Sequence, residues 1–185
     1  MSINFNNAIG SQLKLARTNK GWSLDIASKN TNVSKAMLGQ IERGESSPTV
    51  ARLWDIATGF HLPLSYFFLA IEDDDVSKNM LNSEAGISIS TLFPFDVETK
   101  SEVFSLTLAS LHQQISAPHN DGVIEHILVI EGDMEYLLNG QWHHLSKGDV
   151  VKFNANQKHG YRNVSEHQAV FHNIICYTNE DKTTR

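Results

Sequence analysis

The chain has 185 residues, enough for one or two domains, and its 41% hydrophobic content is sufficient for a buried core. Its net charge of −6 divides unevenly, because residues 1–70 hold seven Lys and Arg against four Asp and Glu, whereas residues 71–185 hold eight against seventeen. One cysteine, Cys176, excludes an internal disulfide framework, and the lack of a signal-peptide pattern or membrane-length apolar run favours a cytoplasmic protein without a membrane partner.

The first part of the chain shows apolar side chains at helical spacing, broken by turn residues. Apolar residues between positions 9 and 16 predict a first helix that ends near residues 20–21, a Lys-Gly pair. Ser23 is placed to cap a second helix, and residues 30–32, Asn-Thr-Asn, form a tight connection after it. Helix, short turn and helix at this spacing indicate a helix-turn-helix, whose second helix enters the DNA major groove.

The run SKAMLGQIERGESSPT, which begins at Ser34, predicts that second helix. Ser34 is a good N-cap, and the apolar stripe around it comprises Val33, Met37, Leu38 and Ile41. The opposite face carries Lys35, Ala36, Gln40 and Arg43. Gly44 ends the helix and Pro48 prevents it from continuing. Further apolar spacing predicts a fourth helix at residues 49–59 and a fifth at residues 63–69.

Residues 8–69 resemble the Cro/CI-type (XRE) helix-turn-helix family, whose hallmark is a capping Ser, then L-x-x-I-E-x-G and a downstream Pro. The residues that carry this pattern are Ser34, Leu38, Ile41, Glu42, Gly44 and Pro48. The resemblance implies that bases are contacted by Lys35, Ala36 and Gln40, and phosphates by Ser23, Ser34 and Arg43. The expected partner is a double-stranded DNA operator. A protein-interaction scaffold is the alternative.

The pattern changes after an acidic, polar linker at residues 71–86. Short β-branched or aromatic runs then follow between Gly, Asn and Pro residues, at positions 87–90, 103–111, 127–130, 134–138, 150–153 and 169–177. Asn139-Gly140 is a strong hairpin signal, because both positions accept positive φ. Many short strands predict an antiparallel barrel or jelly roll. The expected fold class is therefore α+β, with a five-helix DNA-binding domain at residues 1–70 and a β domain at residues 87–185.

Spacings within the β domain resemble the two cupin motifs. The first reads His119-x-Asp121-x3-Glu125-x6-Gly132, and the second reads Gly148-x5-Asn154-x-Asn156-x2-His159-x3-Asn163. Asp121 replaces the second histidine of the first motif, and the two asparagines of the second motif replace the usual Pro and Gly. The resemblance implies a cupin barrel, because the spacing and the turn residues are kept where several identities are not.

Cupin metals are typically held by three histidines and a carboxylate, which here implies His119, Glu125 and His159, with Asp121 in place of an imidazole. Such a set could bind divalent iron, manganese, nickel or zinc. Equally, the four residues could form a metal-free pocket, with His119 and His159 donating hydrogen bonds to an anionic small-molecule effector. Strand alternation is expected to turn His126 away from Glu125.

A Cro/CI-type reader joined to a cupin resembles a group of bacterial transcription regulators, and residues 33–59 and 123–145 are similar to its sulfur-utilisation branch. The resemblance implies a homodimer, not an enzyme, that binds two half-sites ~34 Å apart and changes its operator binding when the cupin binds an effector. The alternative is a metal-dependent enzyme, since the iron-dependent epoxidase that forms fosfomycin has the same architecture. Its triad has a His four residues before the Glu, where this chain has Asp121.

Overall fold

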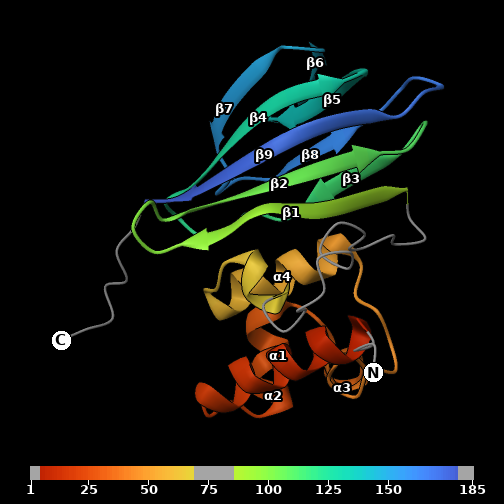
Figure 1. The fold of residues 1–185 in the computed structure, drawn as a ribbon. Coiled ribbons are helices and arrows are strands. Elements are labelled where there is room, and N and C mark those ends of the chain that lie inside the picture. The colour runs from red at the N-terminus through yellow and green to blue at the C-terminus, as the bar shows by residue number, and fades with distance from the viewer. Residues whose placement is uncertain (1–4, 69–85, 179–185) are drawn as a thin grey trace. The chain divides into compact units, whose positions relative to one another are not determined.

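The computed structural model describes residues 5–68 and 86–178, and the chain divides into two compact units between Thr91 and Leu92 (Figure 1). The predicted linker, residues 71–86, lies outside the described residues except for Gly86, so the predicted domain boundaries stay predictions. Within the described part of the chain, no helix combines the length and the apolar character needed to cross a membrane.

Residues 5–68 contain four α-helices and one short 3-10 helix. They span Phe5–Asn19 (α1), Leu24–Thr31 (α2), Lys35–Glu42 (α3), Val50–Phe60 (α4) and Leu64–Phe68 (η1). The prediction of five α-helices is therefore wrong at its last member. The amide of Tyr66 bonds to the carbonyl of Pro63 three residues earlier, at 3.2 Å, which is the hydrogen bond of a 3-10 turn. Packing holds this segment, because Leu64, Phe67 and Phe68 are buried.

Capping side chains fix where three of the helices begin. Ser23, Ser34 and Thr49 each accept a hydrogen bond of 3.2 Å from an amide in the first turn of α2, α3 and α4 respectively. Asn32 adopts the left-handed conformation, with φ of 55°, and so reverses the chain between α2 and α3. The structure thus confirms the predicted helix, turn and helix.

Gly10 allows α1 and α3 to approach each other at backbone distance. A Cβ atom at this position would lie only 2.3 Å from the carbonyl oxygen of Ile41. Around the crossing, Ile9, Leu13 and Leu38 are fully buried. The close contact therefore fixes the position of α3 through its buried face and leaves the other face to solvent.

Nine strands follow, in two antiparallel sheets. They span Ile87–Asp96 (β1), Ser101–Leu108 (β2), Gln113–Ser116 (β3), Val123–Glu131 (β4), Asp133–Leu138 (β5), Gln141–Ser146 (β6), Val150–Asn154 (β7), His159–Arg162 (β8) and Ala169–Tyr177 (β9). The strand order is β1-β2-β9-β4-β7 in one sheet and β3-β8-β5-β6 in the other. Figure 1 shows β3 and β8 behind β2 and β9, so the sheets form the two layers of a jelly roll.

Each predicted strand run coincides with a strand, but β2 ends at Leu108 although the prediction extended to residue 111. Leu111 has a φ of 57° and is 72% exposed, so the apolar run continues into a turn. The Asn139-Gly140 hairpin between β5 and β6 is confirmed, with φ values of 52° and 76°. The sequences of β3 and β8, QQIS and HGYR, each contain only one such residue, Ile115 and Tyr161, which is too few to predict a strand.

Strand β4 positions a carboxylate inside the sandwich. Val123, Glu125, Ile127 and Val129 are buried, and the residues between them are half-exposed. Because side chains alternate along a strand, Glu125 points between the sheets and His126 points to the opposite face, as predicted.

Candidate DNA-reading face and candidate effector site

The exposed side of α3 is the candidate DNA-reading face, defined as Lys35, Ala36, Gln40 and Arg43. All four side chains are exposed, whereas Leu38 and Ile41 on the other side of the helix are completely buried. The structure therefore places on one exposed face the three residues predicted for base contact and Arg43, which is predicted for phosphate contact; the contacts themselves stay predictions. With α3 in a major groove, Lys35, Ala36 and Gln40 would face the base edges.

The two serines predicted at phosphates are both helix caps. Ser23 Oγ accepts from the amide of Ile26, and Ser34 Oγ accepts from the amide of Met37. Each hydroxyl still carries its own proton, which it can donate to a phosphate oxygen while it accepts the capping bond. The cap and the predicted phosphate contact are therefore compatible, and the contact stays a prediction.

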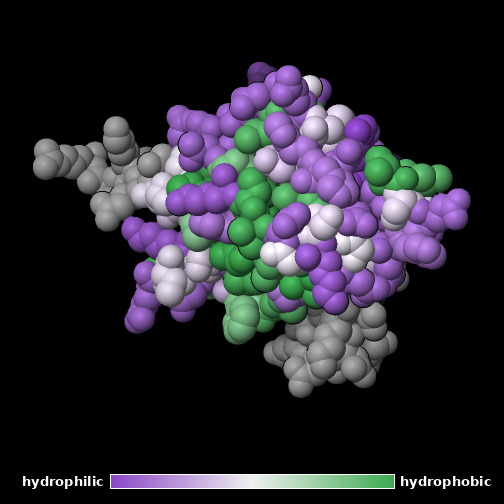
Figure 2. Space-filling model, turned by 90° about the horizontal axis from the view of Figure 1, so that it is seen from above, coloured by the Kyte–Doolittle hydropathy of each residue, from purple (hydrophilic) through white to green (hydrophobic). Residues whose placement is uncertain are grey.

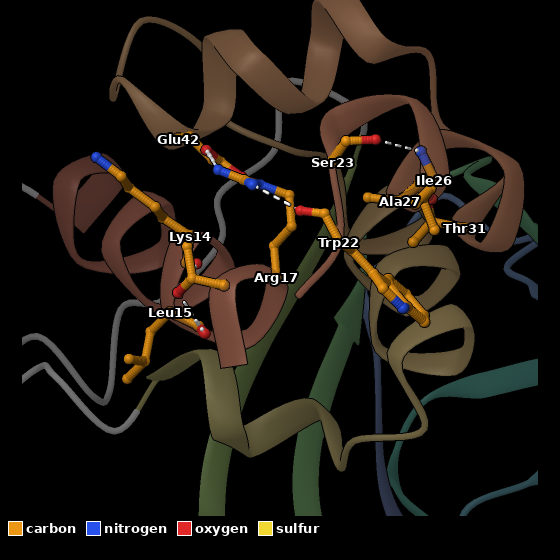
Figure 3. A network of polar contacts seen from close by, with 10 residues as sticks. Lys14, Leu15, Arg17, Trp22, Ser23, Ile26, Ala27, Thr31 and Glu42 are labelled. Atoms are coloured by element: carbon orange, nitrogen blue, oxygen red, sulfur yellow. Dashed lines mark hydrogen bonds and ion pairs between the residues drawn. The ribbon is translucent and has the colours of Figure 1, made fainter. Parts of the chain in front are cut away.

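A buried ion pair joins the three helices that hold the DNA-reading face (Figure 3). Arg17 of α1 donates to both carboxylate oxygens of Glu42, at 2.6 and 2.9 Å, and also to the carbonyl of Trp22, at 2.8 Å. The pair is largely buried, with side-chain exposures of 16% and 8%. It connects α1 with the last residue of α3 and with the chain just before α2, so Glu42 has a structural role in this unit.

Two tryptophans of the helical unit lie at the edge of its core. Leu38 is fully buried, but Trp22, Met37 and Trp54 are only half-buried. Trp22 packs on Phe60, with ring centroids 4.9 Å apart, and the ammonium of Lys20 lies 5.1 Å from the Trp22 ring. Trp22 therefore covers the edge of the core rather than filling it.

In the sandwich, His119, Glu125 and His159 form one buried cluster, the candidate effector site. Glu125 Oε1 lies 3.2 Å from His119 Nε2 and 3.3 Å from His159 Nε2. His119 comes from the loop before β4, where its amide donates to Ala155 at 2.8 Å, and His159 is the first residue of β8. One ligand atom from each of the three residues lies within 4.8 Å of the others. Three of the four predicted site residues are therefore together.

Asp121 is the fourth, and it lies outside this buried cluster of ligand atoms; its predicted part in an effector pocket stays a prediction. It is exposed on the turn before β4, where its Oδ1 accepts a hydrogen bond of 3.1 Å from Asn156. The residues from His119 to Asp121 lie in a loop and not in a strand, so their spacing of two does not place both side chains on one face.

Two residues that the sequence did not predict complete the cluster. Tyr161 and Asn173 both donate to Glu125 Oε2, Asn173 at 2.9 Å. Tyr161 lies two residues after His159 on β8, and Asn173 is a buried amide among apolar residues of β9. An asparagine that interrupts an apolar strand was the signal that could have identified it.

These contacts shift the acidity of three groups. Burial opposes the charge of Glu125, but hydrogen bonds from His119 and His159 outweigh it and hold the pKa of Glu125 well below its usual range. Burial alone would lower the pKa of His159, yet its hydrogen bond to Glu125 raises it. Burial, together with the charge of Glu125, raises the pKa of Tyr161 well above its usual value. The cluster is thus built around an ionised carboxylate.

The hydrogen bonding of His159 tests whether the cluster suits a metal. Its Nδ1 lies 2.8 Å from the carbonyl of Gln157, which can only accept, so Nδ1 carries a proton. A neutral His159 would therefore direct the bare lone pair of Nε2 at the carboxylate of Glu125. Either a proton or a cation has to lie between these two atoms.

Two of the three separations between the ligand atoms suit a divalent cation. Ligands bonded at ~2.1 Å to one ion lie about 3.0–3.4 Å from one another in octahedral or tetrahedral geometry. The separations of 3.2 and 3.3 Å to Glu125 Oε1 fall within that range. Hydrogen bonds to the second carboxylate oxygen and to His159 Nδ1 are also the supporting contacts that metal ligands need.

Comparison with known proteins assigns both units. Residues 13–67 match a helix-turn-helix family model, and residues 110–175 match a cupin domain model. The HTH-type transcriptional regulator SutR of Escherichia coli K12 is 44% identical over 169 residues, which cover 91% of this chain and 94% of SutR. The chain belongs to the HTH-type transcriptional regulators.

Other relatives of this regulator support the same assignment. A crystal structure of an HTH_3 family transcriptional regulator from Vibrio cholerae is 46% identical, has a TM-score of 0.87 and covers 95% of this chain and 98% of its own. The cupin domain of an XRE family regulator from Enterobacter cloacae is 37% identical, with a TM-score of 0.50, and covers 51% of this chain and 99% of its own. The HTH-type transcriptional regulator PuuR of Escherichia coli K12 is 24% identical and covers 85% of this chain and 89% of PuuR.

Proposed function

We propose that this regulator reads a double-stranded operator with the exposed face of α3 and adjusts that binding through a ligand held at His119, Glu125 and His159. The observation that carries the proposal is the exposure of Lys35, Ala36, Gln40 and Arg43 on a helix whose other face is fixed in the core. Gln40 can pair with an adenine edge and Lys35 with a guanine edge. Arg43, Ser23 and Ser34 are suited to phosphates, which fix position without specifying sequence.

The cluster in the sandwich is the proposed sensor. A divalent metal held there by His119, Glu125 and His159 would supply open coordination positions for an anionic effector. Tyr161 and Asn173 orient Glu125, and burial excludes water from its carboxylate. An effector that favours one arrangement of a homodimer would shift the population toward it and so change the affinity for the operator.

A metal-dependent enzyme is the second candidate. Two histidines and one carboxylate are the ligand set of non-haem iron oxygenases, and the two distances from the histidines to Glu125 Oε1 suit it. Iron-dependent consumption of oxygen by the purified chain would favour this candidate over a sensor without catalysis.

The DNA-reading proposal is tested by selecting duplexes from a random pool with the full chain. Gln40→Ala should relax the base preference of the selected site, whereas Arg43→Ala should weaken binding to all sequences by a similar factor. Lys147→Ala, which removes an exposed charge from the cupin domain, is the matched control. Unchanged selection and affinity in both α3 variants would overturn the assignment of the DNA-reading face.

The sensor proposal is tested by metal content per chain, measured by elemental mass spectrometry on protein purified without a tag or chelator. We expect near-stoichiometric divalent metal that is lost in His159→Ala and kept in His144→Ala, an exposed histidine of β6. Operator affinity is then compared with and without the metal. A folded protein that binds no added iron, manganese, nickel or zinc would leave the metal-free effector pocket as the explanation.

A further inference from the structure

Both cations of the DNA-reading face are paired with carboxylates in the free protein. Lys35 Nζ lies 2.8 Å from Asp25 Oδ2, and Arg43 donates two hydrogen bonds to Glu45, at 2.8 and 2.7 Å. Asp25 belongs to α2, which packs beside α3, and Glu45 follows the end of α3. The face that should meet the DNA polyanion is therefore electrically neutral over these four side chains.

Stability does not explain these carboxylates. All four side chains are between 54% and 64% exposed, and ion pairs with that exposure contribute little to folding. Asp25 lies in the first turn of α2, where a negative charge suits the helix dipole to a modest extent. Glu45 follows the C-terminus of α3, the end at which the dipole disfavours a negative charge. At least Glu45 therefore needs another explanation.

Asp25 and Glu45 reduce the binding free energy that Lys35 and Arg43 gain on contact with DNA. While Lys35 stays paired with Asp25, or Arg43 with Glu45, the pair has no net charge to attract a phosphate, although each cation keeps unused N–H donors. To gain the full attraction of a phosphate, the cation has to leave its carboxylate, so one ion pair replaces another. The released carboxylate then lies close to the phosphate chain, which repels it. On a duplex of arbitrary sequence, charge supplies most of the binding free energy, so this exchange of ion pairs adds little affinity. On the operator, Gln40 and the other base contacts add hydrogen bonds that do not depend on net charge.

We propose that Asp25 and Glu45 are specificity-determining residues, which suppress binding to non-operator DNA by neutralising Lys35 and Arg43. The inference rests on the proposed DNA-reading role of α3. The same pattern extends over residues 5–68, where the remaining two carboxylates, Glu42 and Asp55, are also paired with arginines. Every Asp and Glu of residues 5–68 thus has a cationic partner, which limits the field available to attract arbitrary DNA.

The test uses Asp25→Asn and Glu45→Gln, which remove the charge and keep the shape. Full-chain protein is titrated, at several salt concentrations, against the duplex selected from the random pool and against a scrambled duplex of equal length. Affinity for the scrambled duplex should rise several-fold in each variant, and the plot of log affinity against log salt should steepen by about one unit for each freed cation. Affinity for the selected duplex should rise less, so the ratio of the two affinities falls. Glu166→Gln, an exposed carboxylate of the cupin domain, controls for net charge.

A double-mutant cycle separates local pairing from general repulsion. In a Lys35→Gln background, Asp25→Asn should lose most of its effect on the scrambled duplex, because the cation that it frees is gone. Unchanged or weaker binding of the scrambled duplex by both single variants would overturn the inference, as would an equal gain in Glu166→Gln. Failure of the unsubstituted chain to select any duplex would instead overturn the DNA-reading proposal itself, so the two failures are distinguishable.

Discussion

Glu125 uses its two carboxylate oxygens for different contacts. Oε1 faces both histidines, and Oε2 accepts from Tyr161 and Asn173. A carboxylate held in this way offers one oxygen to a metal and keeps the other in a fixed hydrogen-bond network. In the proposed metal site, Tyr161 and Asn173 would therefore orient the ligand oxygen of Glu125 without being ligands themselves.

Removing one of these donors should weaken metal binding without removing a ligand. We expect Tyr161→Phe to lower the affinity of the full chain for Zn²⁺ by roughly 10–100-fold, the usual effect of losing a supporting contact. Competition with a chromogenic chelator measures the affinity. Tyr136→Phe, which removes a hydroxyl from neighbouring β5, serves as the control. Equal affinities in Tyr161→Phe and the unsubstituted chain would show that the hydroxyl does not orient Glu125.

Protonation of His159 should make the metal-free protein more stable at acidic pH. Its pKa is raised in the folded state, so the folded chain holds the proton more tightly than the unfolded chain does. This contribution is complete below the ordinary pKa of about 6.5 and is lost as the pH rises through the folded pKa. Melting temperatures of chelator-treated protein should therefore fall on titration from pH 6 towards pH 8. Metal needs the deprotonated imidazole, so zinc affinity should change in the opposite direction.

His159→Asn is the comparison for that titration. Its melting temperature should depend less on pH over the same interval, because the shifted group is absent. A pH dependence as steep as that of the unsubstituted protein would assign the effect to another residue.

At the scale of elements, the position of α3 depends on close packing against α1. In a helix interior, Gly→Ala ordinarily raises the free energy of unfolding by about 1 kcal/mol. At Gly10 the added methyl group would lie 2.3 Å from the Ile41 carbonyl, so the helices have to separate. We expect Gly10→Ala to lower the free energy of unfolding by about 2 kcal/mol, as other overpacked cores do. Chemical denaturation of the helical unit measures it.

Ser11→Ala is the matched control, because Ser11 is exposed on the same turn of α1. It should change the stability by a few tenths of a kcal/mol, as exposed substitutions do. DNA affinity should fall in Gly10→Ala and not in Ser11→Ala, since only the former moves α3. A stabilised Gly10→Ala protein would contradict the close packing of the two helices.

The elements also separate what a sequence can predict from what it cannot. Local signals identify α2, α3 and the Asn139-Gly140 hairpin, because caps and positive-φ turns depend on neighbouring residues alone. The 3-10 helix η1 and the four-residue strands β3 and β8 are held by packing and pairing with distant segments, which local patterns do not encode. The same difference between local and distant signals decides which residues of the candidate effector site could be predicted. Motif spacing identified His119, Glu125 and His159, whereas Asn173 reaches Glu125 only through pairing of β9 with β4.

At the scale of the whole molecule, the two parts of the chain differ in charge and in surface. Residues 1–70 have seven basic against four acidic side chains, and residues 71–185 have eight against seventeen. Phosphates therefore repel the second part, and only the first is suited to DNA.

Figure 2 shows hydrophobic side chains gathered in a band between hydrophilic ones on one face of the molecule. Half-exposed apolar side chains such as Leu128, Ile130 and Ile174, together with the 70% exposed Val150, occupy the outer face of the larger sheet.

One α3 alone provides few base contacts, so operator recognition should require two chains. Helix α3 has eight residues and presents Lys35, Ala36 and Gln40 for base contact. In helix-turn-helix proteins, a two-fold dimer doubles this number by binding half-sites about 34 Å apart, roughly one turn of DNA. We therefore expect the selected duplex to contain an inverted repeat and to bind two chains.

Sedimentation velocity of the complex measures the stoichiometry, and titration of duplexes with one or two half-sites measures the dependence on spacing. Insertion of about five base pairs between half-sites should abolish tight binding, because it rotates one site to the opposite face of the duplex. A single chain per duplex, with affinity insensitive to that insertion, would show that this regulator reads DNA as a monomer.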